Sequence, residues 1–131
     1  MPVSVQWDNT EKTIIYARYE RWSWDDFYNA LAQCSELAAT VDHTVYIVCD
    51  LVDSIIPKGG TVSHAAATLK RDTDRVGLII LVTSNRFVQA MTNVSSRIIP
   101  GFQKKYRIVS SLDQARQLVA RDTAQRVASK V

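Results

Sequence analysis

The residues best suited to chemistry gather between Asp50 and His64. Two carboxylates, a serine hydroxyl and an imidazole occur there, at Asp50, Asp53, Ser54 and His64. A carboxylate beside a histidine can support general acid–base catalysis. Ser63 and His64 are adjacent, and adjacent residues on a helix do not face each other, so they are not a nucleophile–base pair. An enzyme that uses His64 with Asp50 or Asp53 is one hypothesis, and a half-exposed histidine at a helix start is the other.

The same stretch carries Lys58-Gly59-Gly60-Thr61 just before an alanine-rich helical segment. Glycines ahead of a helix N-terminus can cradle a phosphate. Their order differs from the Gly-x-x-x-x-Gly-Lys-Ser/Thr of P-loops, so nucleotide binding is not expected. His43 falls in a polar turn. Cys34 and Cys49 fall in apolar segments with no ligand-spaced Cys or His, so we expect two reduced core thiols and no metal or cofactor.

Large apolar residues occupy the link that precedes the glycines, at Leu51, Val52, Ile55 and Ile56. A surface loop rarely carries so many apolar side chains without a reason. They either plug the end of the core or form a surface for a partner or an apolar ligand.

Hydrophobic periodicity predicts the elements that must position this link. Alternation and β-branched or aromatic runs predict a hairpin of two strands, 3–7 and 13–19. Nearly continuous apolar runs predict buried strands over 45–50 and 76–82, and a shorter strand covers 106–109. Helical spacing and capping residues predict helices that start at Ser23, near residue 62, at Ser84 or Asn85, and at Ser111. Trp22 and Trp24 flank the first cap, where packing across the strand-to-helix corner is their expected role.

The resulting order is β-β-α-β-α-β-α-β-α. Strands separated by helices imply parallel neighbours and right-handed crossovers. We therefore predict an α/β fold over residues 1–131 as a single domain, with four helices. Its mixed five-stranded sheet is mostly parallel, with an antiparallel first strand at one edge. Sites in such sheets lie at the carboxyl ends of the strands, where Asp50 and the link after it fall.

Charge is distributed unevenly along the chain. Residues 1–53 carry nine acids and three bases, whereas residues 54–131 carry four acids and thirteen bases, so net charges of −6 and +9 give the overall +3. Basic residues with Phe102 and Tyr106 between them are compatible with nucleic-acid binding, but the acidic first half argues against it. Apolar runs shorter than the ~20 residues of a membrane span exclude insertion. Without signal-peptide features at the N-terminus, a cytoplasmic location is expected.

Three motifs resemble a known family. They are Trp22-Ser23-Trp24-Asp25-Asp26-Phe27 at a helix start, Ile47-Val48-Cys49-Asp50-Leu51 at a strand end, and Ser111–Val119 in the last helix. Together they resemble the divergent STAS/SEC14-type branch of the STAS / SpoIIAA-like family. This family has the fold of anti-sigma-factor antagonists and of the cytoplasmic domains of sulfate transporters. The resemblance implies that fold and a regulatory role through protein binding.

In the regulatory members of that family, the loop after this strand carries a phosphorylatable serine within a motif resembling Asp-Ser-[Ser/Thr]-Gly. Here Asp53-Ser54 is followed by Ile55-Ile56-Pro57, a departure from that motif. The resemblance makes Ser54 the phosphorylation candidate, with Thr61 or Ser63 as alternatives.

The leading hypothesis is a non-enzymatic, STAS-like protein-interaction or regulatory module. It would act through the link and the helix after it, with candidate residues Asp50, Asp53, Ser54, Ile55, Ile56, Lys58, Thr61 and His64. A homodimer could form at the edge strand Val3–Trp7 or on the helix face Phe87–Ile98. The alternative, suggested by the SEC14 side of the resemblance, is a small carrier or sensor of an apolar or anionic ligand. That alternative needs a pocket lined by groups such as Leu51, Phe87 and Met91. An unrecognised enzyme is the third hypothesis.

Overall fold

A computed structural model describes residues 2–55, 57, 59, 63, 64, 67 and 75–129 of the chain. Its elements are β1 (Val3–Trp7), β2 (Ile14–Tyr19), α1 (Trp24–Ala38), β3 (Val45–Asp50), β4 (Val76–Val82), α3 (Arg86–Ile98), α4 (Phe102–Lys105), β5 (Tyr106–Val109) and α5 (Leu112–Ser129). Of the helix predicted over 62–71, Ser63, His64 and Ala67 are described and helical, and the rest lies outside the described residues.

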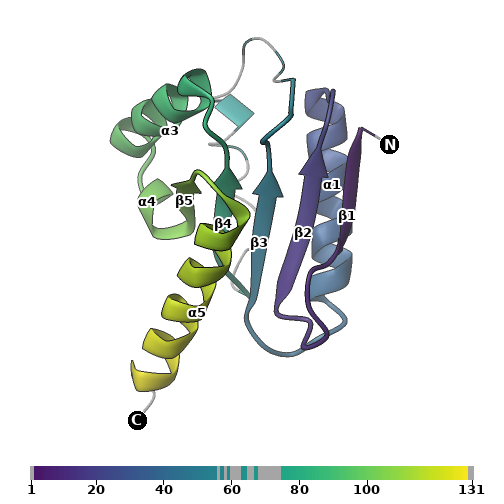
Figure 1. The fold of residues 1–131 in the computed structure, drawn as a ribbon, viewed down its shortest axis with the longest axis vertical. Coiled ribbons are helices and arrows are strands. Elements are labelled where there is room, and N and C mark those ends of the chain that lie inside the picture. The colour runs from purple at the N-terminus through teal and green to yellow at the C-terminus, as the bar shows by residue number, and fades with distance from the viewer. Residues whose placement is uncertain are drawn as a thin grey trace.

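The five strands form one sheet in the order β1-β2-β3-β4-β5. β1 runs antiparallel to β2, and the pairs from β2 to β5 are parallel. This confirms the predicted α/β fold and its mixed sheet with an antiparallel edge strand. Figure 1 shows α1, which connects β2 to β3, behind the sheet, and α5, which follows the last strand, in front of it.

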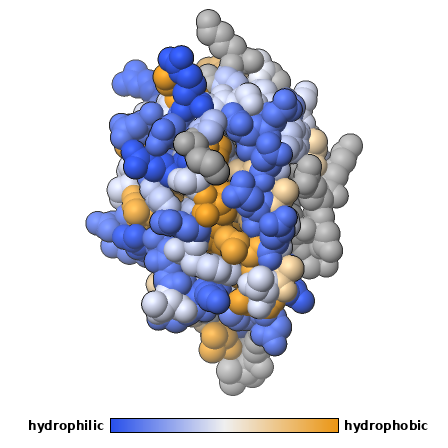
Figure 2. All heavy atoms as spheres, turned by 90° about the vertical axis from the view of Figure 1, so that its right-hand side faces the viewer, coloured by the Kyte–Doolittle hydropathy of each residue, from blue (hydrophilic) through white to orange (hydrophobic). Residues whose placement is uncertain are grey.

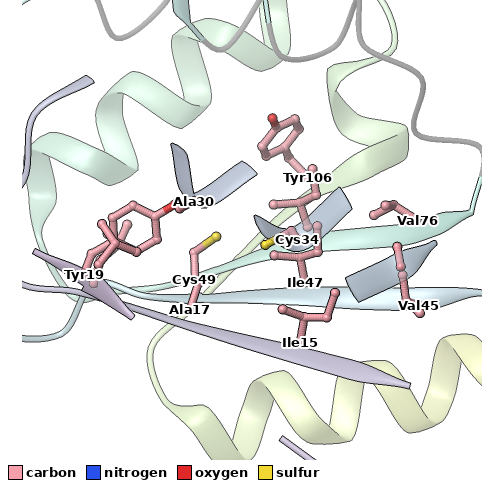
Figure 3. Packing of buried hydrophobic residues seen from close by; sticks show 14 of the residues in the cluster. Ile15, Ala17, Tyr19, Ala30, Cys34, Val45, Ile47, Cys49, Val76 and Tyr106 are labelled. Atoms are coloured by element: carbon pink, nitrogen blue, oxygen red, sulfur yellow. The ribbon is translucent and has the colours of Figure 1, made fainter. Parts of the chain in front are cut away.

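Each face of the sheet has its own hydrophobic core. One core lies between the sheet and α1, α3 and α4, and the other lies under α5. β3 supplies Ile47 and Cys49 to the first core and Val48 to the second, which explains its nearly continuous apolar sequence. Figure 3 shows the first core, with Cys34 from α1 and Cys49 from β3 inside it. Both thiols are buried and free, as predicted, and burial raises the pKa of Cys34 to about 12.

The helices begin where the capping residues predict. Ser23 and Asp26 form a reciprocal capping box at the start of α1. The Asn85 side chain accepts hydrogen bonds from two backbone N–H groups of α3. The Ser111 hydroxyl accepts a hydrogen bond from the Gln114 N–H at the start of α5. One element was not predicted: after Gly101, whose φ is 83°, the one-turn helix α4 buries Phe102. In the described part of the chain, no helix is both long and apolar enough to cross a membrane.

Polar contacts fasten α5 to the sheet. Arg116 pairs with Asp8 at 3.0 Å, and the Tyr46 hydroxyl donates to the Asp122 carboxylate at 2.7 Å. Asp122 also pairs with Arg126 at 2.7 Å. The Tyr46 ring is therefore fixed at its hydroxyl end.

Gly77 gives the Tyr46 ring its space. A Cβ atom at position 77 would lie 2.7 Å from Cε1 of Tyr46 and 3.0 Å from Cγ2 of Thr44. We expect Gly77→Ala to lower the free energy of unfolding by about 1–3 kcal/mol, because the ring cannot shift without losing Asp122. Urea denaturation measures the loss. In a Tyr46→Leu background, Gly77→Ala should lower the free energy of unfolding by a clearly smaller amount. An equal cost in both backgrounds would show that the ring is not the obstacle.

Candidate functional site

A cavity opens at the carboxyl end of the sheet, on the face that carries α1 and α3. Its volume is about 100 Å³. It is bounded by the ends of β2, β3 and β4, the start of α1, the inner side of α3, and α4 with the start of β5. The lining residues are almost all apolar: Tyr19, Trp22, Trp24, Phe27, Cys49, Leu51, Leu81, Phe87, Val88, Met91, Thr92, Ser95, Phe102 and Tyr106. The three residues that the carrier hypothesis required, Leu51, Phe87 and Met91, are among them.

Four aromatic side chains, which we call the aromatic corner, form one wall of the cavity: Tyr19, Trp22, Trp24 and Phe27. The ring of Trp22 lies 5.1 Å from the rings of both Tyr19 and Trp24, in edge-to-face geometry. Trp24 and Phe27 are 5.5 Å apart. Such pairs add stability beyond the area they bury. The two tryptophans thus pack across the strand-to-helix corner, as expected, and at the same time face the cavity.

Ser54 ties the link after β3 to the aromatic corner. The indole Nε1–H of Trp22 donates to the Ser54 hydroxyl at 2.6 Å, and that hydroxyl donates to the Glu20 carbonyl at 3.1 Å. The Ile55 N–H donates to the same carbonyl at 2.9 Å, and Ile55 forms an isolated parallel bridge with Arg21. Ser54 and Ile55 thus hold the start of the link against the segment that follows β2.

His64 meets the start of α1. Its ring stacks on Trp24 at 4.2 Å, and its Nδ1 is 2.6 Å from the Tyr28 hydroxyl. The Trp24 indole N–H donates to the Gly59 carbonyl at 3.0 Å. Gly59 has a φ of 77°, a left-handed conformation that suits glycine. These contacts place His64 and Gly59 beside the aromatic corner.

Asp50 belongs to the opposite face of the sheet. Its carboxylate accepts a hydrogen bond from the Tyr16 hydroxyl and another from the Val52 N–H at 3.1 Å. Burial, followed by the Asp50 carboxylate, raises the pKa of Tyr16 to about 12, so the phenol stays a donor. Asp53 is exposed in a turn. The structure thus places Asp50 on the α5 side and the ring contacts of His64 on the α1 side, and it does not bring Asp50 and His64 together as an acid–base pair.

The apolar link divides between core and surface. Leu51 is 7% exposed and lines the cavity, whereas Val52 and Ile55 are each 54% exposed. Leu51 therefore closes the end of the core, and Val52 and Ile55 remain on the surface, where their role as a binding surface stays a prediction. Ile56, Lys58 and Thr61 lie outside the described residues. Phe87, at the start of α3, adds a third exposed apolar side chain, at 48%.

The aromatic residues within the basic segment are not available to nucleotide bases. Phe102 and Tyr106 are buried and stack on each other at 4.4 Å. Both rings line the cavity instead of facing the surface. Lys105 donates to the Val76 carbonyl at 2.5 Å, and Arg107 donates to the Tyr106 carbonyl at 2.9 Å. Lys105 and Arg107 thus donate hydrogen bonds to backbone carbonyls of β4 and β5.

Several cavity residues were not identified from the sequence. Val88, Thr92 and Ser95 lie on the sheet-facing side of α3, and two of these three are small. Small residues at sheet-facing positions leave space under a helix, and this was the available signal. Among the residues that the structure describes, no three His, Cys, Asp or Glu side chains gather as metal ligands.

Comparison with known proteins identifies no relative of this chain. No protein-family model, no curated protein and no solved structure matches this chain. The fold and the site define an α/β domain with an apolar, aromatic-walled cavity at the carboxyl end of its sheet. The STAS-like assignment rests on the three sequence motifs and stays a prediction.

Proposed function

We propose that this chain is a non-enzymatic, STAS-like protein-interaction module whose binding surface is the carboxyl end of the sheet. The observation that supports it is the aromatic-walled cavity with exposed Val52, Ile55 and Phe87 at the same end of the sheet. Exposed apolar side chains grouped near a cavity are typical of interaction sites. Hot spots in interfaces are anchors that fill such pockets.

The size of the cavity favours a protein partner over a large ligand. Pockets for drug-sized molecules measure about 300–1,000 Å³. The cavity here measures about 100 Å³, room for one apolar side chain of a partner. The exposed side chains would then contact the partner around that anchor.

The site is also held in shape before any partner arrives. Trp22 is fixed by Ser54, and Trp24 is fixed by Gly59 and by the His64 ring. Side chains that are already ordered lose less entropy on binding. Preorganisation therefore supports recognition by the aromatic corner.

A small carrier or sensor of an apolar ligand is the second candidate, because the cavity lining is almost wholly apolar. An apolar cavity of comparable size can bind a benzene-sized molecule. Native mass spectrometry of the purified protein checks this candidate. A co-purifying mass that is lost in Ser95→Leu would favour the carrier, and a ligand-free spectrum would count against it.

Ser54 is the position at which phosphorylation would act on this surface. A phosphate adds a charge of about −1.5 to −2 and removes the hydroxyl hydrogen that Ser54 donates to Glu20. We expect Ser54→Glu to loosen Trp22 and shift its fluorescence to longer wavelength, while Ser35→Glu on the exposed side of α1 should not. Ser54→Ala should lower the free energy of unfolding by about 1–3 kcal/mol, because the indole N–H loses its acceptor. An unchanged fluorescence spectrum in Ser54→Glu would show that a negative charge at position 54 does not displace Trp22.

Site-specific photo-cross-linking in cells of the source organism tests the proposed function. Benzoyl-phenylalanine is placed at position 55, at position 87, or at position 127, where Val127 is 62% exposed on α5. We expect the same cross-linked partner from positions 55 and 87 and none from position 127. Identical products from all three positions, or none from 55 and 87, would contradict the proposal.

A further inference from the structure

One of the hydroxyl side chains on α3 differs from its neighbours. The Thr92 hydroxyl donates to the Val88 carbonyl at 2.8 Å. The Ser96 hydroxyl donates to the Asn93 carbonyl, also at 2.8 Å. Ser95 is 2% exposed, and within the part of the chain that the structure describes its hydroxyl forms no hydrogen bond. Because a buried polar group normally has a partner, the Ser95 hydroxyl indicates a place where a ligand group can be received.

The Ser95 hydroxyl belongs to the inner part of the cavity at the carboxyl end of the sheet. Phe87 and Ser95 both line this cavity. Phe87, at the start of α3, is about half exposed, whereas Ser95 is buried about two helical turns later. Met91, one turn before Ser95, is partly buried. A group that enters beside Phe87 therefore passes apolar side chains first and reaches the Ser95 hydroxyl last.

Aromatic rings from two parts of the fold bound the cavity. The aromatic corner lies where β2 leads into α1, and the rings of Phe102 and Tyr106, stacked 4.4 Å apart, come from α4 and β5. Aromatic rings favour edge-to-face and offset contacts with one another. None of the described residues that line the cavity carries a charge, and burying a charge without a partner is strongly unfavourable. The walls therefore favour an uncharged aromatic ring.

Exposed hydrophobic surface alone would not define a ligand so closely. Figure 2 shows the side of the molecule that carries β1 and α1, where hydrophobic atoms gather between hydrophilic ones. Because the hydrophobic effect is non-directional, such a surface favours apolar groups in general. A hydrogen bond, by contrast, has a preferred distance and angle. The Ser95 hydroxyl therefore selects one kind of group at one position inside the cavity.

We propose that the side chain which the cavity accepts from a protein partner is a tyrosine. Its ring lies between the aromatic walls, and its hydroxyl forms a hydrogen bond with the Ser95 hydroxyl, since each hydroxyl can both donate and accept. This inference rests on the proposed function and adds the chemistry of the anchor. Tyrosine fits because it has an apolar body and one uncharged polar group at its far end. Phenylalanine fills the same space but leaves the Ser95 hydroxyl without a partner.

The experiment compares two probes that differ by a single hydroxyl group. The full chain is titrated by NMR with N-acetyl-tyrosinamide and, separately, with N-acetyl-phenylalaninamide, and the indole N–H signals of Trp22 and Trp24 report binding at the cavity. We expect the tyrosine probe to bind about fivefold more tightly, which is the net contribution of one ordinary hydrogen bond.

Variants on α3 assign the preference to one hydroxyl. Ser95→Ala removes the hydroxyl and keeps the cavity open, so the two probes should then bind equally. Ser96→Ala is the matched control, because the Ser96 hydroxyl already donates to the Asn93 carbonyl and Ser96 is not among the cavity-lining residues. It should keep the fivefold preference. If Ser95→Ala fails to fold, Ser95→Cys takes its place, since a thiol is only a weak hydrogen-bonding group.

Three outcomes would overturn the proposal, and they separate it from the proposed function. Equal binding of the two probes by the unaltered protein would refute the tyrosine anchor and leave the proposed function standing. A preference that persists in Ser95→Ala would refute it as well, because another group would then recognise the probe's hydroxyl. Binding of neither probe would contradict the cavity as an anchor site, and with it the proposed function.

Discussion

Replacing Ile55 and Phe87 together by aspartate should abolish capture of the cross-linked partner and leave the unfolding curve nearly unchanged. Both side chains are about half exposed, so their loss removes little core. Surface substitutions of this kind usually change stability by about 0.5 kcal/mol or less. Hot-spot residues contribute about 2 kcal/mol or more each to binding, which corresponds to roughly 30-fold per residue. Affinity for the purified partner and urea denaturation are the two measurements.

Val127→Asp is the matched control for that experiment. Val127 is at least as exposed as Ile55 and Phe87 but lies on α5, across the sheet from the cavity. It should change neither affinity nor stability. A double variant that binds normally would show that the carboxyl end of the sheet does not bind the partner. One that unfolds readily would show that these side chains belong to the core.

Trp22→Ala should have the largest effect on stability, lowering the free energy of unfolding by about 3 kcal/mol. Its ring contacts Tyr19, Trp24 and Phe27, and its indole N–H is the group that holds Ser54. Truncation removes these contacts and frees the link after β3. Chemical denaturation followed by circular dichroism at a backbone wavelength measures the change.

Trp22→Phe separates ring packing from the hydrogen bond. It keeps an aromatic ring in the corner but loses the donor to Ser54, so it should cost about 1 kcal/mol to 2 kcal/mol. Trp22→Ala should therefore lower the free energy of unfolding by more than Trp22→Phe does. If its loss stays below the value expected for Trp22→Phe, the rings of the aromatic corner do not stabilise one another. The cavity wall would then have no fixed shape.

The sequence predicted the sheet well because its signals are local and periodic. Alternation in Val3–Trp7 and the continuous apolar runs of β3 and β4 follow directly from which faces are buried. Ser23, Asn85 and Ser111 start helices because their side chains satisfy free backbone N–H groups. The buried state of Cys34 and Cys49 follows from the same periodicity.

The candidate site was predicted less completely because it depends on contacts between distant residues. The sequence singles out the link after β3 by its apolar residues, but it does not predict which of these side chains point inward. Leu51 turns into the cavity while Val52 and Ile55 stay outside. Phe102 and Tyr106 stand between basic residues in the sequence, which gives no sign of their burial. Their burial depends on the one-turn helix α4, which has no periodicity to reveal it.

The central claim is that the cavity accepts one apolar side chain, and an NMR titration with N-acetyl-phenylalaninamide tests it most directly. We expect shifts at millimolar concentration in the Trp22 and Trp24 indole N–H signals and in the amides of Phe87 and Met91. Ser95→Leu, which fills the cavity from α3, should remove those shifts while the protein stays folded. Shifts that persist unchanged in Ser95→Leu, or no shifts at these four residues in the unaltered protein, would contradict the claim.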